Sequence, residues 1–142
     1  APIIDLDAIA QIESGGNIEA VGDNGGSIGL FQVAKGGAYA DYCQFRDKRR
    51  FKAISHSNLK LPENNKIVAS WYLSERIPAL LRHFGHPVSV ENVIIAYNCG
   101  ILCVVKGRTP PTTQRYLAKY RSLTYAPAST AKRRTEPNKA GN

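Results

Sequence analysis

The chain has 142 residues, of which 43% are hydrophobic, and its formal net charge at pH 7 is +8. This length suits one domain around a single buried core, and no apolar run is long enough to span a bilayer, which excludes a membrane-spanning protein. We therefore expect one soluble monomeric domain whose basic charge favours polyanionic partners.

A short helix is predicted at the start of the chain, over LDAIAQIE, where Leu6, Ile9 and Ile12 recur at helical spacing. Asp5 suits its N-cap and the glycine pair 15–16 its end. Glu13 then lies in the last turn, where the negative end of the helix dipole disfavours a second negative charge. This placement indicates a carboxyl group that holds its proton.

A glycine-rich segment follows, and its GDNGG cluster predicts turns within a small irregular β segment near residues 17–32. A short helix is expected around AYADYCQF, and SHSNLKLPEN is read as a loop. The next segment, NNKIVASWYLSERIPALLRHFG, carries an apolar helical stripe, and Pro78 should kink or divide that helix.

A central buried helix is predicted from VSVENVIIAYNCGILCVVKG, because this segment is apolar nearly all round and Ser89 suits its N-cap. The last predicted helix is TQRYLAKYRSL. We place the domain at residues 1–125 and expect a basic, structure-poor tail over 126–142. The predicted fold is mainly α, an α+β class with one small β segment and a buried central helix.

Three cysteines allow at most one disulfide bond. Cys99 and Cys103 lie four residues apart on one predicted helix face, so Cys43 could pair with either; three buried thiols are the alternative. No cysteine or histidine has metal-ligand spacing, and we expect neither a metal site nor a cofactor.

The segment RDKRRFK at residues 46–52 carries five basic residues and one acidic residue. Such a run favours nucleic acid, anionic lipid headgroups or an acidic cell-wall polymer, or is simply a solvated loop. A nucleic-acid-binding or structural module is therefore one hypothesis. It is the weaker one, because no recognised nucleic-acid motif occurs and the aromatic residues are not interleaved with the charges.

Five segments occur in this order along the chain: IESGGN, SIGLFQ, NNKIVASWYLSERI, IIAYNCG and YLAKY. In order and spacing they resemble the motifs of the soluble lytic transglycosylase family, which belongs with goose-type relatives to the lysozyme superfamily. The resemblance covers roughly residues 5–123. It implies a lysozyme-like fold and a peptidoglycan-cleaving enzyme.

The resemblance also implies roles for particular residues. Glu13 matches the family's catalytic acid, and the segment containing Ser27 matches the stretch that lines the substrate cleft. The other substrate contacts that it implies are a hydrogen bond from Gln32, an apolar wall from Phe31, and contacts from Tyr97, Asn98 and Tyr116. The aromatic residues could instead be core residues whose hydroxyl groups are satisfied.

The chain departs from the family pattern in places. Cys99 stands where the family has a small residue, ILC replaces the glycine-rich continuation of the AYN motif, and no proline follows Gln32 closely. These departures concern the peptide-side and distal sugar subsites.

One carboxylate suffices for cleavage if the substrate provides the nucleophile. Glu13 would protonate the glycosidic oxygen between N-acetylmuramic acid and N-acetylglucosamine, and the muramic C6 hydroxyl would then close a 1,6-anhydro ring. The nearest rival is a muramidase in which Asp23 positions a water molecule. Asp23 also suits a purely structural role in its turn.

The expected partner is the peptidoglycan glycan strand. The chain begins Ala-Pro-Ile-Ile, which fits a mature form after removal of a signal peptide, or a trimmed one. We expect a periplasmic or secreted, cell-wall-associated protein, or a phage virion component, that serves a secretion, conjugation or phage machine.

Overall fold

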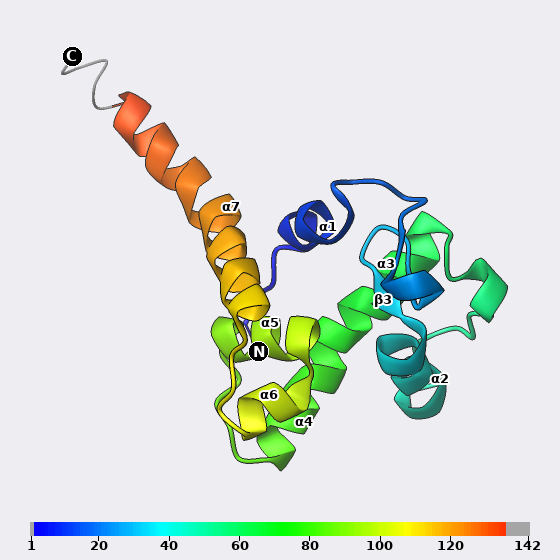
Figure 1. Ribbon diagram of the computed structural model, residues 1–142. Helices are drawn as coiled ribbons and strands as arrows, with labels where there is room; N and C mark the ends of the chain where they lie inside the picture. Colours follow the sequence, from blue (N-terminus) through cyan, green and yellow to red (C-terminus); the bar gives the residue numbers. More distant parts are fainter. Residues whose placement is uncertain (1, 136–142) are drawn as a thin grey trace.

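A computed structural model describes residues 2–135 of the chain, and side chains within residues 2–125. The structure is mainly helical with one small antiparallel sheet, which confirms the predicted fold class (Figure 1). No helix in the described part of the chain is long and apolar enough to cross a membrane.

Helix α1 (Leu6–Ser14) begins and ends where the sequence predicted. The Asp5 side chain accepts a hydrogen bond from the Ala8 amide at 3.1 Å, and Gly15 ends the helix with a φ of 65°. Both ends are set by local signals, which places Glu13 in the last helical turn.

The glycine-rich segment forms a three-stranded sheet, which we call the tongue (residues 20–34). Its strands β1 (Val21–Gly22), β2 (Ser27–Ile28) and β3 (Val33–Ala34) pair antiparallel in the order β1-β2-β3. The 3₁₀ turn η1 (Asp23–Gly25) joins the first two strands. The predicted β segment is thus confirmed, although it extends two residues past the expected end.

The chain then forms a π-helical turn, η2 (Lys35–Tyr39), which runs directly into helix α2 (Ala40–Phe45). A short 3₁₀ helix, η3 (His56–Asn58), interrupts the long connection to the next element.

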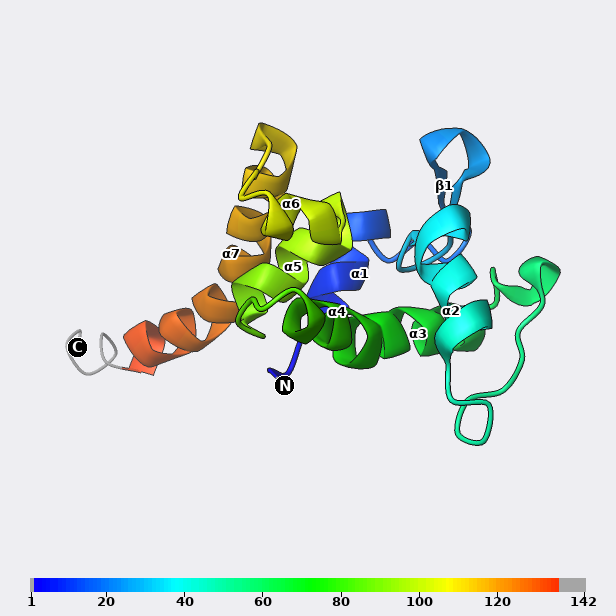
Figure 2. The same ribbon diagram turned by 90° about the horizontal axis from the view of Figure 1, so that it is seen from below.

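A long helical element crosses the molecule, as Figure 2 shows, and is built from α3 (Pro62–Trp71), the π-helical turn η4 (Tyr72–Arg76) and α4 (Ile77–His83). Pro78 has no amide hydrogen to donate to the preceding turn, and the wide turn η4 lies immediately before it. The expected division at Pro78 therefore occurs as a widened turn.

The central helix α5 (Val90–Cys99) starts at Ser89, whose hydroxyl accepts from the Asn92 amide at 3.1 Å. Residues 93–96 are all buried, which confirms the predicted buried central helix. Gly100, with a φ of 98° and a ψ of 156°, breaks the expected continuous helix, and α6 (Ile101–Val105) follows in a new direction.

The break at Gly100 decides the disulfide bond. Cys99 and Cys103 are joined to each other, with their Cα atoms 6.0 Å apart, while Cys43 is free and exposed. The expectation that Cys43 pairs with one of them, or that all three thiols stay free and buried, is wrong. Cys43 belongs to α2, a separate helix.

The last helix, α7 (Pro111–Thr135), packs against α1 and α5 and continues beyond the body of the molecule (Figure 1). The Tyr120 hydroxyl accepts from the Asp5 amide at 2.9 Å, which ties this helix to the start of α1. The chain is helical for ten residues past residue 125, where we had expected a structure-poor tail. The division into a domain and a tail at that point stays a prediction, and residues 136–142 lie outside the described part.

Candidate active site

A cleft of about 320 Å³ lies between the tongue, the end of α1 and the end of α5. Its lining has an acidic and polar part and a part made of small and aromatic residues. The lining residues are Glu13, Asp23, Ser27, Gln32, Ala34, Gly37, Ala38, Tyr72, Ala96, Tyr97, Asn98, Cys99 and Gly100. Five of the seven residues that the sequence assigned to the site lie here; Phe31 and Tyr116 do not line the cleft.

Glu13 is half-buried at the cleft wall and accepts a hydrogen bond from the Tyr116 hydroxyl at 2.8 Å. Burial raises the pKa of Glu13 from 4.5 to about 7. The Tyr116 hydrogen bond opposes this rise because it stabilises the carboxylate, and the negative charge of Asp23 adds to it. Near neutral pH the carboxyl group is therefore present in both protonation states, as an acid and a base in one reaction require.

Tyr116 lies behind Glu13 rather than in the cleft. Its ring is buried, with 8% of the residue exposed, and its hydroxyl contacts Glu13 directly. Burial and the neighbouring Glu13 raise the pKa of Tyr116, so the hydroxyl keeps its proton and remains a hydrogen-bond donor. In this position Tyr116 can act on the substrate only through Glu13.

The loop from Gly29 to Gln32 is held to its surroundings by buried hydrogen bonds. The Ser14 hydroxyl donates to the Leu30 carbonyl at 2.7 Å, which joins the end of α1 to this loop. Asn65 accepts from the Phe31 amide at 2.8 Å and donates to the carbonyls of Ile28 and Leu59 at 2.9 and 3.0 Å. These contacts fix the loop beside Glu13.

Gly29 is required where this loop passes Asn65. Its φ is +79°, and a Cβ atom there would lie 2.7 Å from the Asn65 amide nitrogen. Any larger residue would be both strained and in collision with a buried side chain.

Gln32 lines the cleft with a backbone φ of 48°. Its amide nitrogen donates to the carbonyls of Ala20 and Gly29 at 3.1 and 3.0 Å. Both donors are thus used to brace the tongue. The predicted hydrogen bond from Gln32 to a sugar stays a prediction, and it would need the amide oxygen or an exchange of partners.

Phe31 differs from the expectation of an apolar cleft wall. Only 2% of the residue is exposed, and it belongs to the hydrophobic core. Its amide is held by Asn65, and its carbonyl accepts from the Tyr97 hydroxyl at 2.8 Å. With both backbone groups held in this way, the ring lies in the core and not on the cleft surface.

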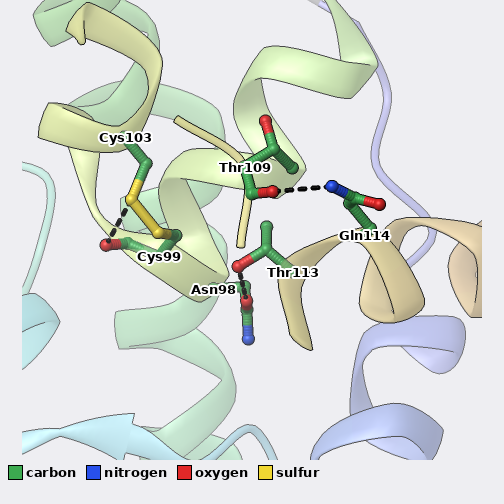
Figure 3. Close-up of a disulfide and its surroundings, with 6 residues drawn as sticks. All are labelled: Asn98, Cys99, Cys103, Thr109, Thr113 and Gln114. Atoms are coloured by element: carbon green, nitrogen blue, oxygen red, sulfur yellow. Dashed lines mark hydrogen bonds between the residues drawn. A yellow bond between two sulfur atoms is a disulfide. The ribbon is translucent and has the colours of Figure 1, made fainter. Parts of the chain in front are cut away.

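Tyr97 and Asn98 reach the cleft from the last turn of α5. The side-chain amide oxygen of Asn98 accepts from the Thr113 hydroxyl at 2.7 Å, as Figure 3 shows. This leaves the Asn98 amide nitrogen as the group that can donate to a ligand. The Cys99–Cys103 disulfide lies directly beside Asn98 and joins α5 to α6 at the cleft edge (Figure 3).

Asp23 is both a turn residue and a cleft residue. Its φ is 50° and its backbone carbonyl accepts from the Gly26 amide at 2.9 Å, which agrees with the structural role in the turn that the sequence suggested. Its carboxylate also lines the cleft and accepts from the buried Ser27 hydroxyl at 2.6 Å. A second carboxylate is therefore available in the same cleft as Glu13.

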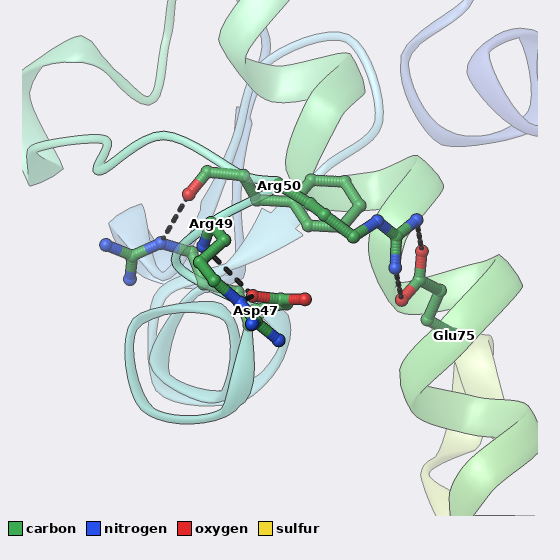
Figure 4. Close-up of polar contacts among 6 residues, drawn as sticks. Asp47, Arg49, Arg50 and Glu75 are labelled. Carbon is green, nitrogen blue, oxygen red and sulfur yellow. Dashed lines mark hydrogen bonds and ion pairs between the residues drawn. The ribbon is translucent and has the colours of Figure 1, made fainter.

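The basic segment 46–52 contributes no residue to the cleft. Arg50 forms two contacts with Glu75, at 2.8 and 3.2 Å, and Asp47 accepts from Arg49 (Figure 4). Arg46 donates to nearby backbone carbonyls. Part of this charge thus holds a surface loop in place. Among the described residues no group of three or more His, Cys, Asp or Glu side chains could hold a metal ion.

Two residues of the site were missed by the sequence reasoning. Asn65 was placed in the predicted helix without a role of its own; a polar residue in register with the buried Val68 and Ala69 was the signal for it. Tyr72 was likewise placed in the predicted helix without a role, and the structure places it in the cleft lining.

A comparison with protein families matches residues 5–116 to the family described as Transglycosylase SLT domain. No curated protein and no solved structure matches the chain.

Proposed function

The chain belongs to the transglycosylase SLT family, whose model covers residues 5–116, and on this premise we propose that it is a peptidoglycan lytic transglycosylase. It would cleave the β-1,4 bond between N-acetylmuramic acid and N-acetylglucosamine and leave a 1,6-anhydromuramoyl product. The observation that supports this best is a single half-buried carboxyl group, Glu13, whose pKa of about 7 suits both an acid and a base.

In the first step, protonated Glu13 gives its proton to the glycosidic oxygen, and the bond from that oxygen to the anomeric carbon breaks. The substrate's 2-acetamido oxygen stabilises the positive charge that develops on the sugar. Glu13 becomes a carboxylate, and the hydrogen bond from Tyr116 stabilises this charge in a partly buried place.

In the second step, the Glu13 carboxylate takes the proton of the muramic C6 hydroxyl, and the C6 oxygen bonds to the anomeric carbon. The ring closes without water, and Glu13 is returned to its protonated form. The nucleophile is tethered to the reacting sugar, so its effective concentration is high. No second carboxylate is needed along this route.

A muramidase is the second candidate, and the position of Asp23 favours it, since its carboxylate lines the same cleft. In that reaction Asp23 would orient a water molecule toward the anomeric carbon. The hydrogen bond from Ser27 fixes one Asp23 oxygen and leaves the other for such a water.

Digestion of purified peptidoglycan, followed by mass spectrometry of the products, tests both candidates. A lytic transglycosylase releases fragments lighter by one water molecule than those of a hydrolase. Glu13→Gln should abolish release, whereas Asp23→Asn should retain the anhydro product. Fragments ending in ordinary muramic acid would establish the hydrolase, and the absence of any wild-type cleavage would reject both.

The setting of this activity belongs to the same proposal. A peptidoglycan-cleaving enzyme acts where the wall is, in the periplasm, outside the cell or at the tip of a phage particle. A small domain of this kind suits a wall-opening step for a secretion, conjugation or phage machine.

A further inference from the structure

A second hollow, larger than the cleft, lies along α3. Its volume is about 670 Å³, and we call it the back groove. It is lined by residues 50–52, from the loop after α2, and by Glu63, Lys66, Ile67 and Ser70 of α3. None of these residues lines the cleft that contains Glu13. The back groove is therefore a separate surface of the molecule.

The back groove and the cleft lie on different faces of α3. The four α3 residues of the groove recur at the spacing i, i+3, i+4 and i+7, which places them on one face of the helix. Asn65, which holds the loop beside Glu13, comes two residues before Ile67 and so points about 160° away from it round the helix. A ligand in the back groove would thus leave the cleft open to substrate.

The back groove continues toward the start of the chain. A smaller hollow of about 310 Å³ shares Ser70 with it and is lined further by the N-terminal segment and by Leu73 and Ser74. Ile3, at the edge of this hollow, is 92% exposed. From Glu63 to Ser74 the helical element is about 16 Å long, and an extended peptide of about five residues spans that length.

The two ends of this surface differ in charge. Arg50 is already paired with Glu75, at 2.8 and 3.2 Å (Figure 4). Lys52 and Lys66 are exposed, and neither forms an ion pair with an acidic group in the described part of the chain. Glu63 is the one acidic residue that lines the groove, and within residues 2–125 no charged side chain lines the smaller hollow. One end is therefore cationic, and the other is apolar.

This combination favours a peptide over the other anionic ligands. A nucleic acid or an acidic wall polymer would meet the lysines but has no aliphatic side chains for the part of the groove beside Phe51 and Ile67. A bilayer surface is flat on this scale and does not enter a hollow. A protein segment that carries both carboxylates and bulky apolar side chains matches the two ends at once, since apolar contacts supply affinity and opposite charges fix the orientation.

We propose that the back groove is a docking site for a segment of a partner protein, with acidic residues that meet Lys52 and Lys66 and apolar residues that lie along Ile67 toward Ile3. The site holds the partner on the face of α3 turned away from the cleft. This inference does not depend on the proposed function, because the peptide binds whether or not the cleft cleaves peptidoglycan.

Selection from a display library of random peptides of about twelve residues, with the whole chain as bait, tests the proposal. We expect the selected peptides to combine acidic and large apolar residues. The Kd of the best peptide is then measured by titration with Lys52→Glu/Lys66→Glu, for which we expect a rise of about 5- to 30-fold. The matched control is Lys48→Glu/Lys119→Glu, which reverses two exposed lysines outside the groove and should change Kd less than about 2-fold.

Two further measurements locate the peptide. A peptide whose acidic residues are replaced by lysine should bind Lys52→Glu/Lys66→Glu better than the parent protein. Ile67→Ala should raise Kd about 3- to 10-fold, whereas Ile18→Ala, at an apolar position outside the groove, should not. Urea unfolding checks that each variant is folded, and Lys52→Ala/Lys66→Ala replaces the charge reversal if that variant is not.

The proposal fails if no peptide is selected, or if the selected peptides lack acidic residues. It also fails if the groove reversal and the control reversal weaken binding equally, since the effect would then come from net charge alone. Cleavage of peptidoglycan should be the same in the parent protein and in Lys52→Glu/Lys66→Glu. If cleavage is lost in this variant and no peptide is selected, the lysines bind the acidic wall polymer instead, and the partner segment is rejected.

Discussion

Replacing Glu13 with Gln should make the protein more stable at alkaline pH while removing its activity. A buried carboxyl group with a raised pKa favours the unfolded state once it ionises there. The rise from 4.5 to about 7 corresponds to at most about 3.5 kcal/mol, at about 1.4 kcal/mol per pH unit. Solvent at the cleft mouth reduces this, so we expect a gain of about 1–3 kcal/mol.

The sign of the effect fixes the pH range. Below pH 4.5 Glu13 is protonated in the folded and unfolded states, and Gln is close to an equal replacement. As the pH rises through 4.5 the unfolded chain loses this proton first, and parent stability falls. The fall is complete above about 7, where the folded state ionises as well. The advantage of Glu13→Gln should therefore grow over this range and then stay constant.

Urea unfolding of both proteins at about pH 4 and about pH 8 measures the difference. Glu19→Gln, at an exposed position outside the cleft, controls for the general loss of a negative charge. A Glu13→Gln variant that is no more stable than the parent protein at about pH 8 would refute the burial of a proton-holding carboxyl group. An equal gain in stability at about pH 4 would refute it as well.

Four further outcomes are expected. Tyr116→Phe removes a hydrogen bond that lowers the pKa of Glu13, so the alkaline limb of the kcat/KM profile should move up by about 1–2 pH units; a downward move would contradict the assignment. Asn65→Ala removes three hydrogen bonds from its side chain to backbone groups of residues 28, 31 and 59 and should cost about 2–4 kcal/mol in urea unfolding, with reduced cleavage. Gly29→Ala should destabilise the fold more than Gly16→Ala. Both glycines have a positive φ, but only at Gly29 would the added Cβ atom collide with a neighbour, Asn65. Equal shifts in melting temperature would argue against this close approach. Reducing the Cys99–Cys103 bond should lower stability by about 2 kcal/mol for so short a loop, whereas Cys43→Ser should leave the melting temperature and its response to reductant unchanged.

Local signals in the sequence were sufficient where a helix end depends on its own neighbours. Asp5 and Ser89 cap the helices that they were expected to cap, because a short side chain reaches only the next few amides. The break at Gly100 was not foreseen, since an apolar stretch on both sides of a glycine is equally compatible with one helix. The error in cysteine pairing followed directly from that missing break.

Contacts between distant segments could not be predicted from residue patterns alone. The family motifs placed Glu13, Tyr97 and Asn98 near one cleft, but the partner of each side chain depends on the packing of whole helices. Phe31 illustrates the limit: its motif position suggested a cleft wall, and the hydrogen bonds of Asn65 and Tyr97 hold it in the core instead. Asn65 and Tyr72 lie within the motif NNKIVASWYLSERI, which was read only as an apolar helix, and their contacts became evident only in three dimensions.

The hydrogen bond between Tyr116 and Glu13 joins residues 103 positions apart, and the bond between Tyr120 and Asp5 joins residues 115 apart. During synthesis the proposed acid therefore leaves the ribosome long before the tyrosine that stabilises its charge. Contacts at such long separation form late in folding and slow it. A partly made chain would hold this carboxyl group in an unfinished site, so the proposed cleavage activity would arise only once the last helix has been made and has docked.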